Sequence, residues 1–167
     1  STMLPDDNGK TDLAKTMAFI KANPSVQANA MWNQQAQTPA SWANTGFFGL
    51  HTFYFNQASG EKTKFRWDIQ PSLGIKTLDK DEAAKMPEEF LVDTFAKQLK
   101  EGIISLTIMA SLGEAEDSEI DPSQQWPESR PQIALGTVTV TANGGDACKN
   151  INFDPNMMSA GFTPSAD

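Results

Sequence analysis

His51 is the only histidine in this chain of 167 residues, and it lies within the aromatic stretch FFGLHTFYF. Imidazole is the side chain whose ordinary pKa lies nearest to neutral pH, so His51 is the first candidate for acid–base chemistry. The alternating aromatic residues predict a β-strand over residues 47–55, covered on both faces. A lone histidine in such a strand is more often a packed core residue than a catalyst, so both interpretations of His51 stay open.

Few residues could complete a site around His51. Cys148 is the only cysteine, which excludes a disulfide within the chain. One histidine and one cysteine far apart in sequence do not make a typical metal site, because such sites need several ligands. A Ser-His-Asp arrangement could use His51, but no Gly-x-Ser-x-Gly turn is present to hold the serine. We therefore expect no metal ion bound directly by this chain.

The charge balance is acidic, with a formal net charge of −8 and a pI near 4.6. Such a surface repels phosphate backbones, so nucleic acid is not an expected partner. No apolar run approaches the roughly 20 residues of a membrane-spanning helix, so we expect no membrane span. The acidic run EAEDSEIDP, residues 114–122, lacks the ligand spacing and glycine of an EF-hand and predicts a solvated loop.

Three longer helices are predicted around the aromatic region. The first begins after Thr11 as N-cap and ends at Asn23, and the second covers residues 25–36. The third covers residues 87–101, with Gly102 as its C-cap. Its expected buried stripe consists of Leu91, Val92, Phe95 and Leu99. A short helix is predicted over residues 78–86.

Four strands are predicted, over residues 47–55, 63–70, 103–112 and 133–142. In the second strand, apolar and charged residues alternate from Thr63 to Gln70, which predicts one face in water. The expected fold class is α+β, with about four long antiparallel strands and flanking helices. Four strands do not close a barrel, since small closed barrels have about eight. The sequence therefore predicts half of a barrel.

The motifs FGLHTFYFNQASGE and FRWDIQP resemble the strand pair of heme catalases, whose usual form is close to GxHTFxxxNxxGExxxVRFHxxP. The resemblance continues in order through GIKTLDKDEAAKM, FLVDTFAKQLKEG, DPSQQWP and INFDPNMMSAGFTPSAD, and covers nearly all of residues 45–167. The N-terminal helices look more like those of the smaller bacterial catalase-related peroxidases. The chain thus resembles part of a heme-dependent catalase or peroxidase acting on hydrogen peroxide.

This resemblance implies roles for four residues. His51 matches a histidine on the proximal side of heme b, which helps to hold an arginine near the iron ligand. Asp167 matches a carboxylate of the same relay, and Phe153 and Pro155 match residues that pack near the proximal heme face. We expect the His51 imidazole to be buried against a concave sheet surface behind the porphyrin, where it orients its neighbours.

The family's iron-ligating tyrosine follows the aspartate that matches Asp167, and its distal histidine precedes the first residue here. Tyr54, the only tyrosine, does not match the ligand position. The resemblance therefore implies that residues 1–167 form a single segment of a catalase-like heme domain. We expect this segment to lack the distal-histidine region and the proximal tyrosine motif, to hold no catalytic residue and to be inactive alone. Gln70 and Glu128 stand where some large catalases have NADPH-binding groups, so we expect no NADPH.

Two other interpretations stay open beside the enzyme segment. One is a non-catalytic half-barrel module that binds a small apolar ligand. The other is a stable fragment whose open strand edges drive self-association, or pairing with the missing half of the barrel. The N-terminal residues carry no basic segment followed by an apolar core, so bacterial cytoplasm and periplasm both fit.

Overall fold

A computed structural model describes residues 8–166, apart from the side chains of Ser25 and Ala28. The chain divides into two compact units, with the boundary between Gln37 and Thr38. None of the helices in the described part of the chain combines the length and the apolar character that crossing a bilayer requires.

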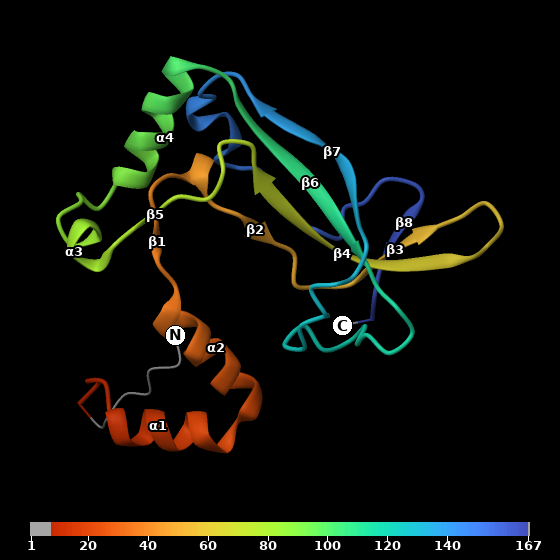
Figure 1. The fold of residues 1–167 in the computed structure, drawn as a ribbon, viewed down its shortest axis with the longest axis horizontal. Coiled ribbons are helices and arrows are strands. Elements are labelled where there is room, and N and C mark those ends of the chain that lie inside the picture. The colour runs from red at the N-terminus through yellow and green to blue at the C-terminus, as the bar shows by residue number, and fades with distance from the viewer. Residues whose placement is uncertain (1–7, 167) are drawn as a thin grey trace. The chain divides into compact units, whose positions relative to one another are not determined.

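The first unit is a pair of helices, α1 (Leu13–Ala22) and α2 (Pro24–Gln35) (Figure 1). Asp12, rather than the expected Thr11, caps α1, because its carboxylate accepts a hydrogen bond of 3.0 Å from the N–H of Lys15. Asn23 ends α1 and precedes α2, whose first residue is Pro24. Proline suits this position, since its missing N–H would have no partner within the helix.

The second unit contains a six-stranded antiparallel sheet in the order β7-β6-β4-β3-β8, with β2 also paired to β4 (Figure 1). The strands are β2 (Phe47–Phe48), β3 (Phe53–Asn56), β4 (Lys62–Pro71), β6 (Ile104–Leu112), β7 (Gln132–Val140) and β8 (Phe162–Pro164). A separate two-stranded sheet joins β1 (Thr38–Pro39) to β5 (Thr77–Leu78). The α+β prediction is confirmed. The larger sheet has two strands more than the four expected, because the first predicted strand is interrupted and β8 was not predicted. The β1–β5 pair was not predicted either.

The strand predicted over residues 47–55 is wrong between Gly49 and Thr52. Phe48 pairs with Asp68, and Phe53 pairs with Phe65. The segment from 48 to 53 therefore advances by five residues where the paired segment of β4, from 68 to 65, advances by three. The two extra residues must loop out of the sheet, and His51 lies in that loop. A local sequence pattern cannot reveal such an insertion, because it is defined only by the partner strand.

Helices at one end of the sheet include α3 (Lys80–Ala83), α4 (Phe90–Glu101) and the short 3-10 helix η1 (Trp42–Asn44). The third predicted helix thus begins three residues late, although Gly102 is its C-cap as expected. Polar side chains attach α4 to η1: the Ser41 hydroxyl donates to the side-chain oxygen Oε1 of Gln98, and the Gln98 side-chain amide donates to Oδ1 of Asn44 over 2.9 Å. The expected buried stripe is only half-buried at Leu91, Phe95 and Leu99, and it is wrong at Val92, which is exposed.

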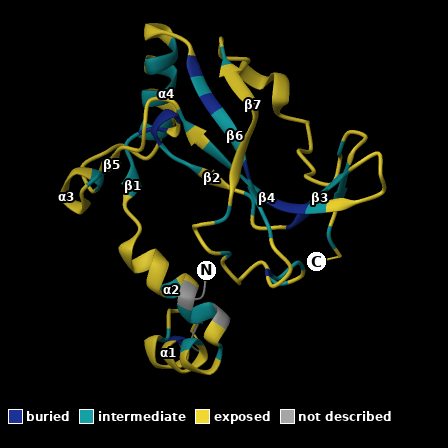
Figure 2. Cartoon of the chain, turned by 45° about the vertical axis from the view of Figure 1, so that its right-hand side comes forward, coloured by how far each residue is buried: buried dark blue, intermediate teal, exposed yellow. Residues whose placement is uncertain are grey.

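The core of the sheet is a small aromatic cluster of Phe53, Phe65 and Ala110. Partly buried residues pack around it, namely Phe55, Trp67, Leu112, Met158 and Phe162. The rings of Phe55 and Phe65 stack with their centroids 4.0 Å apart. Figure 2 shows buried positions along β6 and near the β3–β4 pair, whereas β7 is almost wholly exposed. Burial is therefore concentrated in β6 and the β3–β4 pair, whereas the edge strand β7 is open.

The loop of residues 114–131 covers the charged face of β4, so the prediction of a face in water is wrong at Lys64. This lysine is only 8% exposed, and its ammonium donates to the carbonyl of Asp117 over 2.7 Å. Arg66 donates to the carbonyl of Gln124 over 2.6 Å and stacks over the ring of Trp126. The acidic loop is thus attached to the sheet by two cations that the alternation pattern assigned to solvent.

Candidate functional site

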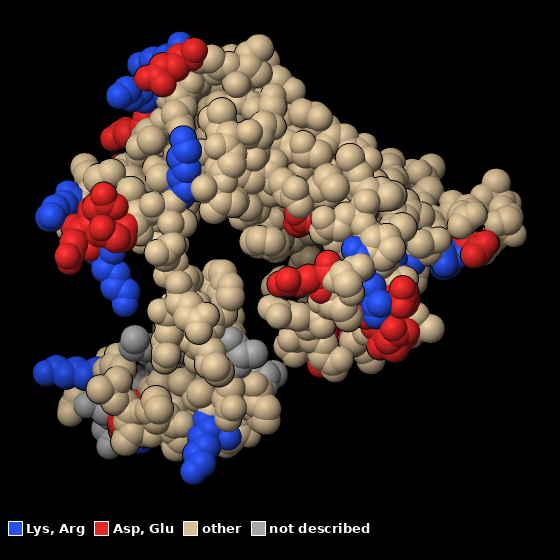
Figure 3. All heavy atoms as spheres, viewed as in Figure 1, with Lys and Arg blue, Asp and Glu red and all other residues tan. Residues whose placement is uncertain are grey.

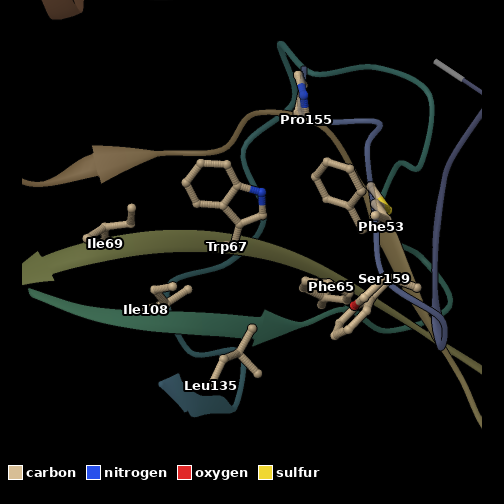
Figure 4. A pocket seen from close by; sticks show the side chains of 10 residues that line it. Phe53, Phe65, Trp67, Ile69, Ile108, Leu135, Pro155 and Ser159 are labelled. Atoms are coloured by element: carbon tan, nitrogen blue, oxygen red, sulfur yellow. The ribbon is translucent and has the colours of Figure 1, made fainter. Parts of the chain in front are cut away.

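An apolar cavity of about 350 Å³ lies on the face of the sheet opposite the acidic loop. Its walls are aromatic and aliphatic side chains, with Ser159 as the one hydroxyl-bearing residue among those that line it. Figure 4 shows Ile69, Ile108 and Leu135 pointing to the same side of the sheet as Trp67, with Pro155 across the opening. Phe53, Phe65, Met158 and Phe162 complete the lining.

Strand register explains why these side chains meet. Ile69 pairs directly with Ile108, and Trp67 pairs with Ala110, so the apolar residues of β4 and β6 share one face. Leu135 is the extra residue of a β-bulge, because Ile108 pairs with Gly136 and Met109 pairs with Ala134. A bulge turns its side chain out of the regular alternation, which brings Leu135 to the cavity.

A smaller cavity of about 90 Å³ adjoins the first, and His51 lines it together with Phe53, Pro155, Asn156 and Pro164. Phe53 and Pro155 also line the larger cavity, so the imidazole lies beside the apolar site. The expectation that His51 is buried against the sheet is wrong for this chain, because the residue is exposed in the loop between β2 and β3. The loop returns into β3 at Phe53, two residues after His51, which keeps the residue near the cavity.

The other sequence-predicted site residues differ in their placement. Pro155 lies at both cavities. Phe153 is 74% exposed and lines neither cavity, so the structure does not bring it together with His51. Asp167 lies outside the described residues.

Charged groups gather away from the apolar cavity. Figure 3 shows them over α3 and α4 and around the loop that follows β6, with a largely uncharged surface over β4, β6 and β7 between them. In that loop Arg130 binds the carboxylates of Glu114, Glu116 and Asp117 at 2.6, 2.7 and 2.9 Å. The guanidinium hydrogen bonds hold the pKa of Asp117 below its ordinary value.

Tyr54 points to the same charged side as the loop. Its hydroxyl donates to the carboxylate of Glu119, which also accepts from Lys64 over 3.3 Å. These two hydrogen bonds lower the pKa of Glu119. Phe53 and Phe55, its neighbours in β3, belong to the opposite, apolar face. Tyr54 therefore does not face the cavity.

Comparison with known proteins identifies the family of this chain. The family model described as Catalase matches residues 2–167. The chain belongs to the catalase family.

Proteins similar to this chain include two catalase-related peroxidases. A catalase-related peroxidase of Synechococcus elongatus is 34% identical over 162 residues, which cover 95% of this chain and 48% of that protein. A catalase-related peroxidase of Mycolicibacterium paratuberculosis is 32% identical over 135 residues, covering 77% of this chain and 42% of the relative. The chain thus spans about half the length of the curated relatives it matches.

A solved bacterial catalase shares the fold, with a TM-score of 0.83 at 20% identity. The match covers 100% of this chain and 35% of that catalase. The antiparallel sheet with flanking helices is therefore a fold that this chain shares with that catalase.

Several cavity residues of this catalase-family chain were not identified from the sequence. Trp67, Ile69 and Ile108 carried a signal, since each lies on the apolar side of an alternating strand. Leu135, Met158 and Phe162 carried none, because a bulge and an unpredicted strand place them at the cavity. Residues 8–166 bring together no group of three or more histidines, cysteines and carboxylates placed to hold a metal ion.

Proposed function

We propose that this chain is part of a heme-dependent catalase or peroxidase that decomposes or reduces hydrogen peroxide. The observation that carries the proposal is the open apolar cavity of a catalase-family sheet, with His51 in the adjoining cavity. Bound heme b would supply the redox chemistry with peroxide in the intact protein. Aromatic and aliphatic walls suit the flat, apolar porphyrin.

The residues at the cavity fit a porphyrin by their chemistry. Phe53, Trp67 and Pro155 offer flat or rigid apolar surfaces, and the sole polar side chain of the lining is a small hydroxyl. A volume of about 350 Å³ lies at the lower end of the range of about 300–1,000 Å³ for small-molecule pockets. We infer that this face supplies one wall of the heme pocket and that other residues of the intact protein supply the remainder.

His51 and Asp167 are proposed to support the proximal side of the heme, with Phe153 and Pro155 in the pocket wall. In this role His51 holds a hydrogen-bonding neighbour in place and does not itself touch peroxide. The support for this role is that His51 and Pro155 line the same small cavity. Tyr54 is not proposed as the iron ligand, because its hydroxyl binds Glu119 on the charged face.

Hemin titration tests both parts of the proposal. We expect the purified chain to bind hemin with a shifted Soret band but to consume hydrogen peroxide no faster than free hemin does. Leu135→Lys places a charge at the cavity and should weaken binding, whereas Thr137→Lys, on the opposite face of β7, should not. Turnover above that of free hemin would refute the inactivity, and unchanged binding by Leu135→Lys would refute the site.

A non-catalytic module that binds a small apolar ligand is the second candidate, because the same cavity has the size and lining of such sites. An absorption spectrum of the intact protein distinguishes the two candidate functions, since an iron–tyrosinate spectrum favours the enzyme.

We also propose that no NADPH binds. Gln70 and Glu128 are the expected contact positions, and the Gln70 amide instead donates to Asp68 over 2.9 Å.

A further inference from the structure

Two adjacent methionines at the edge of the cavity have opposite surroundings. Met157 is 84% exposed. Met158 is partly buried, packs against the cluster of Phe53, Phe65 and Ala110, and lines the apolar cavity. The pair therefore offers one thioether to solvent and holds the other among aromatic rings.

The turn that carries the pair explains this difference. Asp154 accepts hydrogen bonds from the N–H of Asn156 on its carboxylate, over 2.9 Å, and from the N–H of Met157 on its carbonyl, over 3.1 Å. The N–H of Met158 in turn donates to the carbonyl of Asn156 over 3.0 Å. This tight turn precedes β8, which pairs with β3 and keeps the Met158 side of the segment on the core.

Hydrogen peroxide oxidises a thioether directly. The sulfur attacks one peroxide oxygen, the O–O bond breaks, and the products are a sulfoxide and one molecule of water. The sulfur loses two electrons and the peroxide gains them, so no further reagent is required. The rate depends on access of the oxidant to sulfur, and methionine sulfoxide reductases can reverse the product.

The two sites also differ in what a sulfoxide would do to the fold. At Met157 the new polar oxygen would lie in water. At Met158 it would lie among Phe53 and Phe65, where burying a polar group without a hydrogen bond is unfavourable. Folding should therefore protect Met158 and leave Met157 open to reaction.

We propose that Met157 is a methionine oxidation site for hydrogen peroxide, located beside the cavity that His51 lines. Pro155 and Asn156, which precede Met157 in the turn, both line that cavity. The modification marks exposure of the chain to peroxide without disturbing the aromatic cluster. The oxidation requires neither heme nor enzymatic turnover, so it can be tested independently of the proposed enzymatic function.

The test exposes the full chain, without hemin, to dilute hydrogen peroxide and follows sulfoxide by peptide mass spectrometry with fragment ions that separate residues 157 and 158. We expect Met157 to react at least about tenfold faster than Met158 in the folded protein. In urea the two rates should become equal. Met17, which is exposed on α1, provides a reference for an accessible thioether. Met157→Leu should remove the early sulfoxide from the peptide that contains residues 157 and 158 and leave that of Met17.

Equal rates in the folded chain, or earlier oxidation of Met158, would overturn the proposal. A rate ratio that persists in urea would also overturn it, because the difference would then come from local sequence rather than from folding. Chain that is oxidised only at Met157 should unfold at the same urea concentration as untreated chain. A lower unfolding midpoint would contradict the inference that a sulfoxide at Met157 lies in water and leaves the fold unchanged.

Discussion

Gly49 is the residue at which the chain leaves the sheet before His51. Its N–H donates to the carbonyl of Trp67 over 2.8 Å, so the backbone lies directly against the neighbouring strand. A Cβ added at Gly49 would lie 2.5 Å from Cε2 of the Trp67 indole. Because Gly49 has no side chain, the backbone can leave the sheet at this point, and the Trp67 indole can occupy its place at the cavity.

We expect Gly49→Ala to destabilise the chain by about 1–3 kcal/mol, because the rigid indole or the strand must move to admit the methyl group. Urea unfolding followed by circular dichroism measures the change. Gly136→Ala in β7 is the matched control, since no atom lies within 4 Å of its added Cβ. Equal unfolding midpoints for the two variants would show that the close approach of Gly49 to Trp67 does not affect stability.

At the scale of elements, the loop of residues 114–131 is the one whose structure depends most on charge. Asp117 is buried, and it accepts two hydrogen bonds from Arg130 and one of 2.7 Å from the N–H of Glu114. Bidentate pairing of this kind fixes geometry as well as charge. The loop is thus held by ionised groups rather than by an apolar core.

The lowered pKa of Asp117 predicts loss of stability in acid. The folded-state pKa lies below the ordinary value of 3.8, mainly because of the Arg130 hydrogen bonds, so ionised Asp117 stabilises the fold above that value. This contribution is lost as the pH falls through the lower, folded-state pKa. We expect Asp117→Asn to cost about 1–3 kcal/mol at neutral pH and to flatten the dependence of the unfolding free energy on pH.

Urea unfolding at a series of pH values, from about 6 to about 2, measures this dependence. Glu128→Gln, in an exposed position of the same loop, is the control and should retain the profile of the unmodified chain. Parallel profiles for Asp117→Asn and the unmodified chain would contradict the assignment of acid sensitivity to this pair.

At the scale of the whole molecule, the sheet of residues 38–166 leaves apolar surface uncovered. Ile133, Leu135 and Val138 of β7 are all exposed, and β7 contains no charged residue. Native edge strands usually carry charges, proline or a cover that discourages pairing. We propose that this strand and its apolar face are where the chain associates with itself or with the remaining part of a catalase barrel.

Sedimentation at several concentrations tests that association for the isolated chain. We expect the average mass to rise with concentration, against the repulsion of a net charge of −8. Val138→Lys should suppress the rise, and Thr137→Lys, on the other face of the same strand, should suppress it less. A monomer at every concentration would contradict the prediction.

The sequence by itself determined the α+β class, the position of β4, β6 and β7 to within about two residues, and the family, through motifs around His51. These properties depend on residues that are close together in the sequence, because strand alternation and the order of motifs can be recognised without the fold. The alternation of the second predicted strand also placed Trp67 among apolar residues that share one face.

Only the tertiary structure decided the loop at Gly49, the bulge at Leu135 and the burial of Lys64. Each depends on a partner distant in sequence: the register of β4, the register of β6, and carbonyl groups of the acidic loop. The pairing of β8 with β3 likewise places Met158 on the aromatic core. Alternation tells which residues share a face, but the neighbour across the sheet decides whether that face meets water, a loop or a cavity.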